Sequence, residues 1–421
     1  MTTHADTAKI TDMAKNTTKN TESAEQKTAA KTTSRLPWLD GLKGLACFDV
    51  FTHHFFLAFF KASYFGTEMP SLLPGGIDTL LSYKPYGVFL NGNFWVCLFL
   101  LISAYLPACQ IMRTPEDKLR NRVGTMILKR YPRLMLPAFS VCVINFILLH
   151  VLNALHMNYI DKPLDYSFGG LLMHGLVLMW TKVDSMLIGP FWTLHYFLLV
   201  PLFAMLLAIP ARKENRYMPF IYSALLIVFF EYDILFDYYM AGVLGVLLAD
   251  LTCHDRFATL RERIPALTKK ACLLPLSLLL LSAGLWMGGY PSYVDPEGLY
   301  TRFSFLVARN NGTSVLLHIA GAFLILCALH LWQAASLPDL LSTRPFQFLG
   351  RICFPVFMLH MLWIEYLGYF VMDRLSAVTG SVASAALPVY LLLLVLVLLS
   401  STLFHHTIEK WCEKICSKIH A

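Results

Sequence analysis

Two residues near the start of the apolar sequence are spaced so that they could act together. Lys43 and His54 are eleven residues apart in an apolar run that extends from Arg35 to Phe60. Eleven residues of α-helix turn through about 1100°, which is close to whole turns, and rise about 16 Å. One helix face therefore carries both side chains, whereas His53 points about 100° away. Ionisable groups deep in a bilayer are costly and indicate function, and a neutral imidazole can act as a general base or a nucleophile.

Each of these residues also has a plain structural interpretation. Asp40 can cap the first helix by accepting a free backbone N–H. Lys43 can extend its ammonium group to the lipid headgroups. A buried neutral histidine bonded to a carbonyl is common, so His54 alone is ambiguous. Asp49 is a second acid in the same run, without an evident partner.

A basic segment follows the second apolar run. It extends from Arg113 to Arg133 and ends Lys-Arg-Tyr-Pro-Arg. Arg130 and Arg133 are three residues apart, so a helix lets them face one way. Arginine forks match phosphate oxygens in pairs, which makes a phosphate site one interpretation. Positive charge retained on the inner side of a membrane is the other.

Further polar groups lie in the later apolar runs. His360 follows a proline-containing segment, and Trp192 and His195 open another run. Core packing explains His360 equally well, and a tryptophan near a membrane interface is usually an anchor. Glu409 lies in the amphipathic end of the last run, where a solvated or paired charge is the simplest interpretation.

The composition is that of a membrane protein. Of the 421 residues, 57% are hydrophobic and only 14% are charged, against about a quarter charged in typical globular chains. Apolar runs near 20 residues recur, as transmembrane helices require. The net charge of +7 comes from clustered loop residues and indicates topology, not nucleic-acid binding. The ten cysteines show neither a CxxC pair nor zinc spacing, so we expect no disulfide framework and no metal site.

We therefore predict an all-α, polytopic transmembrane helical bundle with about ten spans and both termini in the cytoplasm. Residues 1–34 have low complexity and are expected to form a disordered cytoplasmic tail. Residues 35–415 form the membrane domain, and residues 416–421 a second cytoplasmic tail. The stretch 167–180 is too short for a span and suits a re-entrant or interfacial segment. The ten expected spans cover residues 44–61, 87–109, 134–155, 190–210, 217–232, 234–250, 271–289, 312–333, 350–372 and 384–404.

The distribution of basic residues supports this topology. With the N-terminus inside, 27 of the 34 lysines and arginines fall in the inner segments. Such a bias is the usual signature of cytoplasmic loops. An eleventh span at 167–180 would move the cluster from Arg212 to Arg216 outside and spoil the pattern.

The ordered set of motifs resembles the acyltransferase-3 family of integral membrane acyltransferases. Leu39-Asp-Gly-Leu-Lys-Gly-Leu-Ala followed by His54 is similar to the first helix of that family, in which ten residues separate a basic residue from a histidine. The other similar segments are Phe99–Leu106, in which Ala104 replaces the usual glycine, Arg130–Arg133, Trp192–Leu194 with Pro201, Val356–His360 and Ile408–Lys410. The resemblance covers nearly the whole membrane domain. It departs from the family at position 197, where this chain has phenylalanine in place of glutamate. Either a carboxylate role is lost, or Glu231, Asp233 or Asp237 supplies it.

The resemblance implies an O-acyltransferase, most simply an O-acetyltransferase, in the cell membrane. The donor is expected to be cytoplasmic acyl-CoA, with no permanently bound cofactor, and the acceptor an extracytoplasmic carbohydrate or glycolipid hydroxyl. His54 and His360 are then the candidate catalytic residues. Lys43, Arg130 and Arg133 are the candidate donor-phosphate contacts, and Ser103, Tyr105, Trp192 and His195 the candidate substrate contacts. A proton-coupled transporter and a catalytically degenerate family member are the alternatives, and the bilayer is the expected surrounding.

Overall fold

The computed structural model describes residues 36–83, 85–155, 167–183, 187–232, 237–264, 270–309, 314–332 and 336–420. Within these ranges every regular element is helical and there is no strand. From residue 38 onward the described residues make up one compact unit. The all-α prediction is therefore confirmed for the described part of the chain. The predicted tail, residues 1–34, lies outside the described ranges.

Five helical stretches in the described ranges are long and apolar enough to cross a membrane. They are Gly92–Met112, Glu116–Ala154, Gly189–Ala211, Arg344–Thr379 and Val382–Ser417. They contain α5 (Gly92–Met112), α6 (Glu116–Ala154), α9 (Trp192–Ala211), α17 (Arg344–Trp363), α18 (Tyr369–Thr379), α19 (Val382–Phe404) and α20 (Lys410–Ser417). A bend of 102° separates α2 (Pro37–Phe59) from residues 62–68, and this pair is a sixth candidate.

The remaining predicted spans coincide with shorter apolar helices. These are α10 (Met218–Glu231), α11 (Tyr239–Cys253), α13 (Lys270–Gly288) and α15 (Val315–Leu331). Each of the ten predicted spans thus contains a described helix, but only five or six of the described helices have the length of a span. The ten-span count and the position of the termini stay predictions. The short helices are α3 (Ala62–Phe65), α4 (Ile77–Tyr83), α7 (Phe168–Met173), α8 (Met179–Thr181), α12 (Arg256–Arg263), α14 (Ser304–Arg309) and α16 (Ser336–Leu341).

Local sequence sets several helix ends. Asn91 precedes α5, and its side chain accepts the backbone N–H of Phe94. Ser381 does the same for Ser384 at the start of α19. Such caps satisfy backbone donors that have no partner inside the helix. Gly380 ends α18 in the left-handed conformation, with φ of 81°, which a glycine adopts without steric cost.

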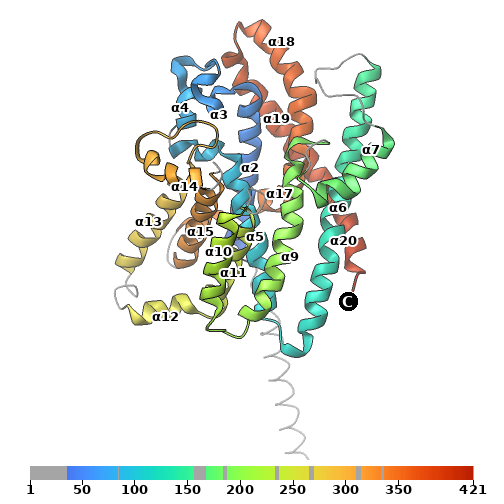
Figure 1. Cartoon of the computed structure of the whole chain (residues 1–421). Coiled ribbons are helices and arrows are strands. Elements are labelled where there is room, and N and C mark those ends of the chain that lie inside the picture. Colours follow the sequence, from blue (N-terminus) through green and yellow to red (C-terminus); the bar gives the residue numbers. More distant parts are fainter. Residues whose placement is uncertain are drawn as a thin grey trace, which may run out of the picture. The chain divides into compact units, whose positions relative to one another are not determined.

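Helix α2 packs against several later helices of the bundle (Figure 1). Trp38 contacts His330 of α15, with ring centroids 5.1 Å apart. Phe51 contacts Tyr390 of α19 at 5.4 Å, and Phe59 contacts Tyr369 of α18 at 5.1 Å. The opening apolar run is therefore a buried helix with neighbours along its length.

Glycines let α2 and α17 approach each other closely. A Cβ atom built on Gly350 would overlap the backbone oxygen of Asp40, and one on Gly44 would lie 2.7 Å from Cβ of Leu349. Small residues commonly allow such crossings of membrane helices. Because α2 carries His54 and α17 carries His360, this crossing sets the spacing of the two histidines.

A second close crossing joins α5 and α11, which Figure 1 shows beside α9. A Cβ on Gly245 of α11 would lie 2.7 Å from Cβ of Ala104. Ala104, which stands where the family usually has glycine, therefore lies at a close helix contact. Alanine at this position suffices because the partner is glycine.

The segment between α2 and α5 is held by a buried acid. The carboxylate of Asp78 accepts hydrogen bonds from the backbone N–H groups of Leu72 (2.7 Å) and Thr79 (3.2 Å) and from the hydroxyl of Ser71. Burial raises the pKa of Asp78, but the hydrogen bonds lower it more, so the net pKa lies below its ordinary value. The ionised form therefore stabilises this segment at neutral pH, and that contribution is lost as the pH falls through the lowered pKa.

Candidate active site

The structure brings His54 and His360 together. Nδ1 of His54 and Nε2 of His360 are 3.2 Å apart, and the ring centroids are 4.9 Å apart. His360 is fully buried and His54 is half-buried. The two residues are 306 positions apart in the sequence. Only the packing of α2 on α17 makes them a pair.

Backbone carbonyls fix the protonation of this pair. Nδ1 of His54 lies 2.8 Å from the oxygen of Val50, and Nδ1 of His360 lies 3.0 Å from the oxygen of Val356. Since a carbonyl only accepts, both Nδ1 atoms carry the proton when the rings are neutral. Nε2 of His360 then accepts a second hydrogen bond from the same Nδ1–H of His54. In this tautomer Nε2 of His54 is unprotonated and has a free lone pair, which is the form that a general base needs.

His53 has a different environment. Its Nδ1 lies 2.5 Å from the oxygen of Leu90, and its ring packs against Gly92, where a Cβ would overlap the ring. The side chain is 6% exposed. His53 thus joins α2 to the start of α5, and the choice of His54 as the histidine that does chemistry stays a prediction.

Lys43 lies at the start of the same helix face but is not alone. Its Nζ forms an ion pair with Asp40 at 2.7 Å. Asp40, Lys43 and Glu409 all lie within electrostatic range of Cys353 on α17. Glu409 is in turn 2.6 Å from Nδ1 of His405. Asp40 therefore acts as a partner of Lys43 in the first turn, a pairing that the spacing of three residues allows.

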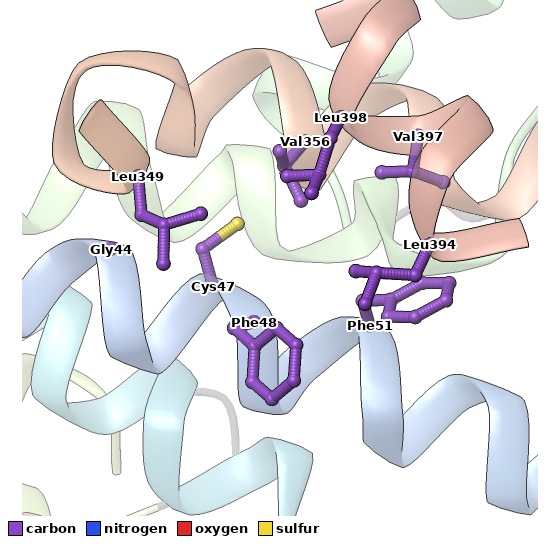
Figure 2. A pocket seen from close by; sticks show the side chains of 9 residues that line it. All are labelled: Gly44, Cys47, Phe48, Phe51, Leu349, Val356, Leu394, Val397 and Leu398. Atoms are coloured by element: carbon purple, nitrogen blue, oxygen red, sulfur yellow. The ribbon is translucent and has the colours of Figure 1, made fainter. Parts of the chain in front are cut away.

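A small apolar cavity lies between this charged end and the histidine pair. Figure 2 shows Gly44, Cys47, Phe48 and Phe51 of α2 facing side chains of α17 and α19 across it. The facing residues are Leu349, Val356, Leu394, Val397 and Leu398. Its volume is about 10 Å³, which is about the room that one water needs. Cys47 closes one side, where its Sγ lies 2.9 Å from the oxygen of Cys353.

Arg130 points into the bundle and meets the backbone at position 197. Its Nε and Nη2 donate to the carbonyl oxygen of Phe197 at 3.2 and 2.5 Å. This carbonyl lacks its usual helical donor because residue 201 is proline, which has no N–H. The guanidinium therefore satisfies an oxygen that Pro201 leaves open. Sequence reasoning missed this contact, and its signal was the proline four residues after Phe197.

Arg133 does not share this position. It is 69% exposed and lies 3.9 Å from Glu413 of α20. Arg130 is thus engaged by a backbone carbonyl and Arg133 is exposed, and the prediction that they contact donor phosphates together with Lys43 stays a prediction. Of the acids considered as substitutes for glutamate at position 197, Glu231 pairs with Arg309 at 2.5 Å, Asp237 is 1% exposed, and Asp233 lies outside the described residues.

The four candidate substrate contacts are on α5 and α9. Ser103 donates to the oxygen of Leu100 at 2.8 Å, within its own helix. Tyr105 is buried and accepts a weak hydrogen bond from Thr252 at 3.4 Å. Nδ1 of His195 lies 3.1 Å from the oxygen of Trp180. Trp192 is half-buried, with its ring centroid 5.6 Å from that of Tyr238.

We expect Arg130 and Pro201 to be energetically coupled. Arg130→Met should destabilise the protein by about 1–3 kcal/mol, because it leaves the Phe197 carbonyl without a donor. In a Pro201→Ala background the new N–H can serve that carbonyl, so the cost should fall by about 1 kcal/mol or more. Free energies of unfolding from SDS titration in micelles measure both. Arg120→Met, at an exposed position of the same helix, is the control. Equal costs in the two backgrounds would contradict the assignment.

In the described residues these features define a helical membrane protein in which a half-buried histidine, on the helix that also carries the Lys43–Asp40 ion pair, contacts a fully buried one. The chain matches the family model of the acyltransferase-3 proteins, described as an acyltransferase domain, over residues 36–406. It therefore belongs to that family and is a membrane acyltransferase. No curated protein and no solved structure matches the chain.

Proposed function

We propose that the protein is an O-acyltransferase that moves an acyl group, most simply acetyl, from cytoplasmic acyl-CoA to a hydroxyl of an extracytoplasmic carbohydrate or glycolipid. The observation that carries this proposal is the oriented pair of His54 and His360 at the far end of the Lys43 helix face. Family membership supports acyl transfer in general.

The reaction follows from the protonation of the pair. The lone pair on Nε2 of His54 takes the proton of the acceptor hydroxyl while its oxygen attacks the thioester carbonyl. The C–S bond then breaks, and the proton passes from His54 to the leaving CoA sulfur. During this exchange His54 is transiently a cation. The carbonyl oxygen of Val50 and Nε2 of His360 stabilise this cation by accepting hydrogen bonds from its Nδ1–H. His360 is thus proposed to orient the base, and a direct contact with the acceptor is the alternative role.

The donor is proposed to enter beside Lys43 and to extend its pantetheine arm through the apolar cavity. A cavity of about 10 Å³ admits no such chain, so α2, α17 and α19 must separate on binding. Lys43 would exchange its partner Asp40 for a donor phosphate, which a compact ammonium ion can bind. Arg133 is exposed enough to contact the same donor. Arg130, by contrast, has a structural partner and is not needed for this step.

Donor analogues test this entry. Lys43→Ala should raise KM for acetyl-CoA about 10-fold, which is the loss expected of one charged hydrogen bond. The same change should leave KM for acetyl-pantetheine, which lacks the nucleotide phosphates, unaltered. Lys43→Ala also leaves the carboxylate of Asp40 without its cation, which could itself repel the donor phosphates. The double variant Asp40→Asn, Lys43→Ala removes that carboxylate, so any remaining rise in KM is due to loss of the lysine. Lys61→Ala, an exposed lysine just after α2, is the control. An equal effect on both donors would rule out phosphate recognition by Lys43.

A further inference from the structure

A chain of hydrogen bonds joins three helices near His53. Tyr238 donates its hydroxyl proton to Oδ1 of Asn93 at 2.6 Å. Nδ2 of Asn93 lies 2.9 Å from Nδ1 of His318, and Nε2 of His318 lies 3.0 Å from the oxygen of Tyr290. Asn93 and His318 are in the first turns of α5 and α15, and Tyr238 immediately precedes α11. His53 contacts the same end of the bundle through Leu90.

The direction of this chain follows from a neighbouring amide. Nδ2 of Asn91 has two protons and two carbonyl partners, Gly288 at 2.9 Å and Tyr290 at 3.1 Å. It has no proton left for His318, so Nε2 of His318 donates to Tyr290 and Nδ1 accepts from Asn93. Oδ1 of Asn93 then accepts from Tyr238. The hydroxyl proton of Tyr238 is used in the hydrogen bond to Asn93. The hydroxyl oxygen of Tyr238 can therefore only accept a hydrogen bond from another group.

Aromatic rings pack against the ring of Tyr238, and a nearby aromatic ring is exposed. The rings of Trp192 and Tyr196 lie 5.6 and 4.6 Å from the ring of Tyr238. Tyr293 is 57% exposed and packs on Tyr64 at 4.5 Å, and both lie within electrostatic range of Tyr238.

The ring of Tyr64 connects this aromatic cluster to the histidines. It lies 5.0 Å from the ring of His53, which is 4.8 Å from the ring of His54. Aromatic faces with a few oriented polar groups are the usual lining of a small-molecule site.

We propose that Tyr238 recognises the acceptor through a hydroxyl next to the one that is acylated; this rests on the proposed function. Carbohydrates carry neighbouring hydroxyls, so one can lose its proton to Nε2 of His54 while the next donates to the oxygen of Tyr238. The half-buried Trp192 supplies a face for the apolar side of the sugar ring. Asn93 and His318 are positioning residues, because they act only by holding the Tyr238 proton away from the ligand.

Deoxy sugars test this assignment. The acceptors are methyl α-glucoside, α-mannoside and α-galactoside with their monodeoxy analogues, and the donor is acetyl-CoA. Wild-type protein should prefer a parent glycoside over the analogue lacking the neighbouring hydroxyl by about 100-fold in kcat/KM, since the Tyr238 acceptor would be left unpaired. Tyr238→Phe should lower kcat/KM for the parent glycoside to the value for the deoxy analogue, and it should leave kcat/KM for the analogue unchanged. Undiminished discrimination in Tyr238→Phe would overturn the proposal.

Two further variants separate recognition from structure. Tyr300→Phe removes another buried hydroxyl, one that donates to the oxygen of Trp286 at 2.6 Å. It should lower the unfolding temperature somewhat, because a buried hydrogen bond is lost, and leave discrimination between the sugars unchanged. Asn93→Ala keeps the Tyr238 ring but frees its proton, so discrimination should fall below that of wild type. The unfolding temperature of each variant identifies any that merely fail to fold.

Binding measured without turnover separates this inference from the proposed function. Quenching of Trp192 fluorescence by the same glycosides, with Trp192→Phe as the blank, reports occupancy directly. Glycoside binding that weakens in Tyr238→Phe, in a protein that transfers no acyl group, would leave the site standing and refute the transferase. Glycoside acylation that is indifferent to Tyr238→Phe would do the reverse. A protein that neither binds nor acylates any of these glycosides overturns the carbohydrate assignment.

Discussion

Replacing His54 by alanine is expected to lower acyl transfer by at least about 100-fold, within the range that general-base catalysis contributes. The reason is specific to this ring. Its Nδ1 proton is held by Val50 and His360, so Nε2 is the available base. His54→Gln should fall as far, because an amide nitrogen cannot take the hydroxyl proton. The assay is transfer of labelled acetyl from acetyl-CoA to the best glycoside acceptor by purified protein.

A matched control comes from α6. Nδ1 of His150 lies 2.9 Å from the oxygen of Phe146, four residues earlier, which is the local bonding that His54 shows with Val50. His150 is exposed, so His150→Ala should retain full transfer. Retained transfer in His54→Ala would refute the mechanism. Transfer lost equally in both variants would show that the effect is structural.

Substitution of Gly350 is expected to lower the stability of the protein. A Cβ at this position overlaps the backbone oxygen of Asp40, and a backbone atom cannot move aside as a flexible side chain can. Gly350→Ala should therefore cost about 1–3 kcal/mol, as overpacking usually does, and Gly350→Leu should yield no folded protein. Fluorescence-detected size exclusion and thermal unfolding in detergent measure the two outcomes.

The folded fraction of Gly350→Ala should also lose activity. The crossing of α2 and α17 at this glycine determines how far His54 is from His360, so separating the helices lengthens the 3.2 Å contact. The control is Gly189→Ala, at a glycine where an added methyl group would meet no atom within 4 Å and where φ is not positive. A Gly350→Ala protein as stable as wild type would contradict the close approach of the two backbones.

The apolar runs predicted the helices well, because burial in lipid requires long uninterrupted apolar sequence. All ten predicted spans coincide with described helices, yet several are shorter than a span, and sequence alone does not indicate where helix gives way to turn. The helical spacing of Lys43 and His54 was likewise readable, since it depends on one helix only. The contact between His54 and His360 was not, since it depends on how two distant helices cross.

The arginine pair shows the other limit of sequence reasoning. Three-residue spacing predicts a shared face for Arg130 and Arg133, but Arg130 turns inward to a carbonyl and Arg133 stays exposed. What decides between them is a missing N–H on another helix, at Pro201. A sequence motif identifies a charged side chain, but it does not show which main-chain atoms lack a hydrogen-bond partner.

That main-chain partner changes how position 197 should be regarded in protein engineering. Every amino acid carries the same carbonyl, so no substitution at Phe197 removes the oxygen that Arg130 holds. The phenyl ring of Phe197 instead packs against neighbouring aromatic residues, and its centroid lies 6.0 Å from that of Phe357. Installing a glutamate there would place a carboxylate beside Phe99 and Phe357, while the carbonyl that Arg130 holds would stay in place.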